Sequence, residues 1–141
     1  MSQIAPSQYY SEETVEGIRY ANYVQGGALM SRFGTLDHTD TTAKTLFTLP
    51  KGAIITRIMV DVTEAFNDGA SNDLDIGLGG TANALADDLD VTNIGQIVTG
   101  MASYSLTPLT TATDVTVTFV PGTAATTGEA TVFIDFMVVD S

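Results

Sequence analysis

The segment 48–80, TLPKGAIITRIMVDVTEAFNDGASNDLDIGLGG, limits the possible fold more than any other part of the chain. Its first half alternates apolar with polar side chains, so one side of an extended chain would carry Ile58, Val60 and Val62. After a polar loop over residues 67–72, the alternation resumes with Leu74, Ile76 and Leu78. Two such runs joined by a loop of Asn, Asp and Gly predict a β-hairpin with one buried face, formed by Ala53–Thr63 and Asn72–Leu78.

Further strands are predicted on both sides of this segment, at Lys44–Leu49, Ile94–Val98, Ser103–Leu106, Thr113–Val120 and Ala130–Val139. Residues 81–90, TANALADDLD, show no sustained period and are predicted as a loop or a single helical turn. About seven short strands with turns between them and little helix predict an all-β fold, an antiparallel β-sandwich or barrel, of which we favour the β-sandwich. The closely spaced strand pairs favour a jelly-roll-like arrangement, because the Cys and Trp markers of an immunoglobulin sandwich are absent from the sequence.

The last predicted strand is apolar on both of its sides. Val132, Ile134 and Phe136 share one side, while Phe133 and Met137 lie on the other. A strand with apolar residues on both faces is expected to be buried on both faces. We therefore expect one side to face the core and the other to face a partner, which closed symmetry such as a trimer would supply.

The charge of the chain is high and uneven. The formal net charge is −12, and from Ile58 onward there are twelve acidic residues and no Lys or Arg. Such a surface argues against binding nucleic acid through phosphate contacts. It serves either as a solubility device or as an acidic body that faces solvent while a neutral N-terminal segment docks. No membrane-length apolar run, no signal-peptide pattern and no Cys are present, so we expect a protein made in a reducing cytoplasm that does not enter membranes.

The N-terminal residues differ in character from the rest. Residues 1–40 lack strand alternation and are rich in small and polar side chains, yet they contain four of the five tyrosines, Tyr9, Tyr10, Tyr20 and Tyr23. Two interpretations remain open at this point: a frayed terminus, or an arm that becomes ordered against its own body or a neighbouring subunit. We divide the chain accordingly into an N-terminal arm, residues 1–40, and a β-sandwich domain, residues 41–141.

No catalytic signature accompanies the strands. The one histidine, His38, lies in a polar stretch without a nucleophile elbow, and is interpreted as a surface loop residue. Asp73 and Asp75 share one face of a strand, and Asp87, Asp88 and Asp90 cluster in the predicted loop, so paired carboxylates of a glycosidase are an alternative. Solvated strand and loop carboxylates are the favoured interpretation. The sequence predicts no catalytic residues, no enzyme activity and no cofactor.

Among small ligands, calcium is the hypothesis that best fits the residue types of the loop after residue 66. Asn67, Asp68, Asp73 and Asp75 place oxygen donors within nine residues of chain, and these are weak candidates for metal ligands. The spacing is not that of an EF-hand, and the same residue types are what an ordinary turn uses. A plain turn is the favoured interpretation, and no metal is assigned.

The same segment resembles the accessory structural proteins of tailed bacteriophage particles. The match covers about residues 45–80 and consists of Leu49, Pro50, Gly52, Ile55, Val60, Val62, Ala65, Phe66, Asn67 and Gly69, followed by Gly77 and Gly79. The resemblance implies a β-sandwich that assembles as a homotrimer. It also implies attachment to the outside of a phage capsid as a decoration or cement protein, with the major capsid protein as partner.

The combined interpretation is a structural virion protein of the capsid exterior, assembled in the host cytoplasm, with neither nucleic acid nor membrane as partner. The arm would hold the capsid or neighbouring subunits through Ile4, Tyr9, Tyr10, Arg19, Tyr20, Tyr23 and Arg32. The alternative is a head-fibre or tail-tip module for host-surface or carbohydrate recognition, which would use the loops around residues 67–72 and 81–90.

Overall fold

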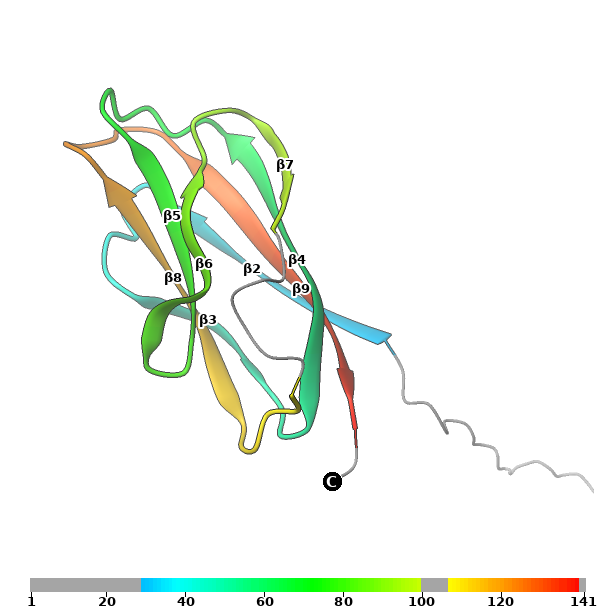
Figure 1. Cartoon of the computed structure of the whole chain (residues 1–141). Coiled ribbons are helices and arrows are strands. Elements are labelled where there is room, and N and C mark those ends of the chain that lie inside the picture. The colour runs from blue at the N-terminus through cyan, green and yellow to red at the C-terminus, as the bar shows by residue number, and fades with distance from the viewer. Residues whose placement is uncertain (1–28, 100–106, 140–141) are drawn as a thin grey trace, which may run out of the picture.

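The protein is a sandwich of two four-stranded antiparallel sheets (Figure 1). The computed structural model describes residues 29–99 and 107–139. Sheet I has the strand order β2 (Leu29–Asp37), β9 (Glu129–Val138), β4 (Ala53–Glu64) and β7 (Gly95–Val98). Sheet II has the order β3 (Lys44–Leu49), β8 (Thr113–Pro121), β5 (Asn72–Leu78) and β6 (Thr81–Asp90).

The core lies between the two sheets and is built by the alternation predicted from the sequence. The predicted inward residues of β4, β5, β8 and β9 are buried, among them Ile58, Leu74, Val117 and Ile134, except Leu78 at the end of β5, which is half-buried. Each fully buried side chain of this size stabilises the fold by about 1.5–3 kcal/mol relative to exposure. The prediction of an all-β antiparallel sandwich is thus confirmed.

The strand order is that of a jelly roll, as predicted. Successive strands of the described chain lie in opposite sheets, except for β5 and β6, which are neighbours in sheet II. The chain therefore passes from one sheet to the other at nearly every connection, as in the paired Greek keys of this fold.

The predicted hairpin between Ala53–Thr63 and Asn72–Leu78 is wrong, although both strands exist. β4 lies in sheet I and β5 lies in sheet II, so the intervening loop crosses between the sheets. The Asn and Asp residues of that loop bond to the β8–β9 connection instead of closing a hairpin. The hairpin of this region joins β5 to β6 through Gly79 and Gly80, with Gly79 at a φ of +64°.

Two other segments also differ from the sequence prediction. Residues 81–90 form strand β6 rather than a loop, and register shifts along the β5–β6 pair explain why no period was visible. Leu29–Asp37 forms edge strand β2 although it lies within the predicted arm. Its inward positions include Arg32 and Gly34, which interrupt the apolar alternation. The predicted strand Ser103–Leu106 lies outside the described residues.

Gly128 illustrates how tightly the crossing end of the sandwich is packed. A Cβ at this position would lie 2.4 Å from the ring of Phe66, and the φ of +143° is one that other residues rarely adopt. We predict that Gly128→Ala lowers the free energy of unfolding by about 2–4 kcal/mol, from ring displacement and backbone strain together. Urea denaturation measures the change. Gly69→Ala is the control, because a Cβ there meets no atom within 4 Å, and an equal loss in both variants would contradict the account.

Candidate functional surfaces

Two connections cross between the sheets at one end of the sandwich and are tied to each other (Figure 1). They are the β4–β5 loop, residues 65–71, and the β8–β9 loop, residues 122–128. Asn67 accepts hydrogen bonds from the backbone N–H groups of Thr126 and Thr127, at 2.7 and 3.0 Å. Phe66 beside it is buried and packs on Phe119, with ring centroids 4.6 Å apart. The Ala-Phe-Asn-Asp sequence therefore anchors one loop to the other.

Asp68 is the centre of this junction. Its buried carboxylate accepts hydrogen bonds from the backbone N–H groups of Ser71, Gly122, Thr123 and Ala124, and from the Thr123 hydroxyl. The Thr123 hydroxyl is the largest contribution that lowers the pKa of Asp68 far below its ordinary value, followed by the Ser71 N–H. The carboxylate is ionised in the folded protein and serves as a fixed acceptor for two loops.

The predicted metal candidates do not form one site. Asn67 and Asp68 are occupied by the hydrogen bonds of the loop junction, so their oxygens are committed to the protein itself. Asn72 holds the backbone of Asp68 from both sides: its Oδ1 accepts from the Asp68 N–H at 2.8 Å, and its Nδ2 donates to the Asp68 carbonyl at 2.9 Å. The favoured interpretation of the loop as a structural element fits this geometry.

Replacing Asp68 tests the junction. Asp68→Asn substitutes two N–H groups for one acceptor oxygen, and we predict a fall of more than about 5 °C in the midpoint of thermal unfolding at pH 7. Because the folded-state pKa of Asp68 lies below its unfolded value of about 3.8, its stabilisation is present above that pH. The difference between wild type and variant should therefore shrink as the pH falls below about 4.

Asp61→Asn, on the outer face of β4, is the matched control for this experiment. An equal drop in the midpoint for both variants, or a difference that persists unchanged to pH 2, would contradict the role given to Asp68.

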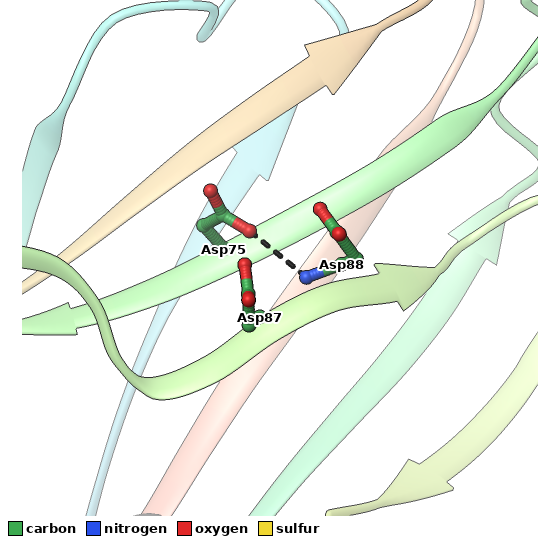
Figure 2. Close-up of side chains that lie close together, drawn as sticks. All are labelled: Asp75, Asp87 and Asp88. Carbon is green, nitrogen blue, oxygen red and sulfur yellow. Dashed lines mark hydrogen bonds between the residues drawn. The ribbon is translucent and has the colours of Figure 1, made fainter.

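A cluster of three carboxylates lies on the outer side of sheet II (Figure 2). Asp75 comes from β5, and Asp87 and Asp88 come from the neighbouring strand β6, with one oxygen of each within 4.8 Å of the others. The backbone N–H of Asp88 donates to Asp75 Oδ1 at 2.9 Å, and Asp88 has a φ of +56°. The sequence indicated Asp75 on a strand and Asp87 and Asp88 in a loop. It did not bring them together, because residues 81–90 were not recognised as a strand paired with β5.

The carboxylates of this cluster repel one another. The charge of Asp87 is the main cause that raises the pKa of Asp88, with partial loss of water and the charges of Asp73 and Asp75 adding to it. Oxygen donors of this kind suit hard cations, but exposed acidic groups of this density are common on proteins without a bound ion. The effect that the geometry supports is a local electrostatic cost to folding.

We predict that Asp88→Asn raises the midpoint of thermal unfolding by a few degrees at pH 7 and low salt. The change removes one repelling charge, and Asn adopts a positive φ readily. Because the folded-state pKa of Asp88 is raised, the native state binds its proton more readily than the unfolded state does. The advantage of the variant should therefore disappear as the pH falls through that pKa, and also in high salt. A variant less stable than wild type at pH 7 would contradict the account.

The residues assigned to the arm are divided by the structure. Six of them lie outside the described residues: Ile4, Tyr9, Tyr10, Arg19, Tyr20 and Tyr23. Arg32 lies on β2, where its Nη1 donates to the Thr48 carbonyl of β3 at 2.8 Å and its guanidinium stands 5.9 Å from the Phe136 ring centroid. The side chain thus links the edges of the two sheets.

The structure also places the other residues that the sequence singled out. His38 lies in the β2–β3 connection, where its backbone N–H donates to the Gly128 carbonyl at 3.0 Å. Phe133 and Met137, expected to face a partner, lie half-buried on the outer face of sheet I. Within the described part of the chain, no helix is long and apolar enough to cross a membrane.

The fold places the protein among two-sheet jelly rolls. Comparison with known proteins identifies solved structures that share this fold. No family model matches the sequence, and no curated protein matches it significantly. Solved structures do match. One is the Ralstonia phage GP4 capsid, in which a chain with 19% sequence identity aligns over 89% of this chain and 94% of its own length, with a TM-score of 0.64.

Two further phage structures contain a similar chain. The cyanophage Pam1 capsid asymmetric unit gives 17% identity over 85% of this chain and 91% of the other, with a TM-score of 0.62. The acid-stable capsid of Helicobacter pylori bacteriophage KHP30 gives 12% identity over 81% of this chain and 98% of the other, with a TM-score of 0.57. At these identities the comparisons establish a shared fold with chains of phage capsid structures.

Proposed function

We propose that this protein is a structural, non-enzymatic component of a phage virion that binds the outer surface of the capsid and stabilises the shell. It acts as a decoration or cement protein, associates as a homotrimer and has the major capsid protein as partner. The observation that carries the proposal is the fold shared with chains in three phage capsid structures. Fold alone does not define function. The size and the charge of the chain also support the proposal.

The size of the matched chains supports an accessory role. The alignments cover 91–98% of the neighbouring chains and 81–89% of this one, so whole chains correspond to each other. The described residues form one small sandwich, which has the dimensions of a part added to a shell.

The charge supports an exterior position. A net charge of −12 would be repelled by packaged nucleic acid inside a capsid. On the outside, the same charge keeps the exposed part of the protein solvated. Binding to the assembled shell in preference to its dissociated subunits would stabilise the shell by mass action.

Attachment through the N-terminal arm is the part of the proposal most open to a direct test. Deletion of residues 2–25 removes four of the five tyrosines and Arg19 but leaves every described strand, the first of which begins at Leu29. We predict that the truncated protein remains folded by circular dichroism and loses at least about tenfold in affinity for capsids that lack this protein, measured by co-sedimentation. The full chain should also raise the temperature at which those capsids break up.

Tyr9→Ala with Tyr10→Ala is a milder arm variant that should weaken binding in the same direction. Full capsid binding by the truncated protein would contradict the arm model while leaving the decoration role intact. Absence of capsid binding by the full chain, together with specific binding on a glycan array, would contradict the decoration role and favour host-surface recognition.

A further inference from the structure

We infer that the outer face of sheet I is the surface through which one copy of this chain packs against a second copy. The inference deepens the proposed function, because it names the contact between copies. The strand register aligns four apolar residues in a row across the whole sheet: Phe33, Phe133, Met59 and Val98. A second, shorter row consists of Leu29, Met137 and Ile54. We call these two rows the apolar face.

Three of the seven residues of the apolar face are open to solvent in the described structure, and the other four are half-buried. Phe33 is 66% exposed, Leu29 is 65% exposed and Val98 is 62% exposed. The Phe33 and Phe133 rings lie 5.6 Å apart, so the row is a continuous surface and not a set of scattered side chains. An antiparallel sheet that faces water on one side ordinarily carries polar residues there, and contiguous exposed apolar patches mark contact surfaces.

The outer face of sheet II shows what a solvated face of this protein looks like. The outward positions of β5 and β8 carry Asp73, Asp75, Asp114, Thr116 and Thr118. Val120 is the apolar exception at the end of β8, at 41% exposed. The outer faces of the two sheets therefore differ in chemistry. Sheet I carries rows of apolar side chains, whereas the outward positions of β5 and β8 carry mainly Asp and Thr.

The charge of the chain favours the apolar face as the place where a second copy binds. Two chains of net charge −12 repel each other, so contact between copies is most favourable where the surface carries the least charge and the most apolar area. Between the two rows lie Arg57 and Asp135, which pair with each other at 4.0 Å and leave this part of the face with no net charge. A basic partner would instead be drawn to the acidic outer face of sheet II.

The extent of the apolar face also favours a folded partner. Four strands spaced about 4.8 Å apart, with rows about 13 Å apart along them, give a patch of several hundred Å² once side chains are included. That is about half of the ~800 Å² that each side of a standard protein interface contributes. Residues surrounding the rows would complete a contact between two such surfaces.

The test replaces the most exposed apolar residues with a polar strand former. In Phe33→Thr/Val98→Thr, both changed side chains are more than three-fifths exposed, so the fold should be retained. We expect wild-type protein to associate in analytical ultracentrifugation, and the double variant to associate at least about tenfold more weakly. Val120→Thr, on the outer face of sheet II, is the matched control and should associate as wild type does.

Salt provides a second measurement. Association of two acidic chains through an apolar face should become tighter as added salt screens their repulsion. Wild-type protein that stays monomeric at about 100 µM in high salt would overturn the inference. So would a double variant that associates normally but no longer binds capsids, since the face would then dock on the shell. Association through this face without capsid binding would leave the inference standing and would contradict the proposed function instead.

Discussion

The arrangement of the two sheets depends on the buried carboxylate of Asp68. Backbone hydrogen bonds of a sandwich run within each sheet, so the relative position of the sheets is set by core packing and by the loops that cross between them. Two of those loops meet at one end of this molecule, and Asp68 accepts backbone N–H groups from both. Phe66 fills the space beneath, where only a glycine at position 128 leaves room for its ring.

The anchored sandwich presents two outer faces that differ in chemistry, although both carry carboxylates, including Asp61 and Asp135 on sheet I. Sheet II carries carboxylates and threonines, including the cluster of Asp75, Asp87 and Asp88, whose repulsion is tolerable only where water and salt screen it. Sheet I carries rows of aromatic and aliphatic side chains across all of its strands. A body of this kind has one side suited to solvent and one suited to association, as a repeated component of a symmetric particle requires.

Much of this could be predicted from the sequence, because period-two alternation reports directly on a strand with one buried face. The inward residues of β4, β5, β8 and β9, apart from the half-buried Leu78, followed from that signal. The jelly-roll arrangement followed from the close spacing of the strand pairs and the absence of immunoglobulin markers. Strand pairing did not, since the loop residues Asn67 and Asp68 have the composition of a hairpin turn but bond to a loop 54 or more residues away. β6 was missed because its register shifts break the period, and β2 because Arg32 and Gly34 occupy inward positions at the sheet edge. The members of the carboxylate cluster were singled out separately, on a strand and in a loop, and their proximity was not predicted, since they come together only through the pairing of β5 with β6.

The central claim is that this sandwich is fixed to the outside of a phage capsid, with its acidic face toward solvent. Cryo-electron microscopy of the particle that carries the protein tests it most directly. The account predicts density for the sandwich on the outer surface of the shell, with sheet II facing outward and neighbouring copies meeting through sheet I. Density for this chain at the tail tip, or on the inner surface of the shell, would contradict it.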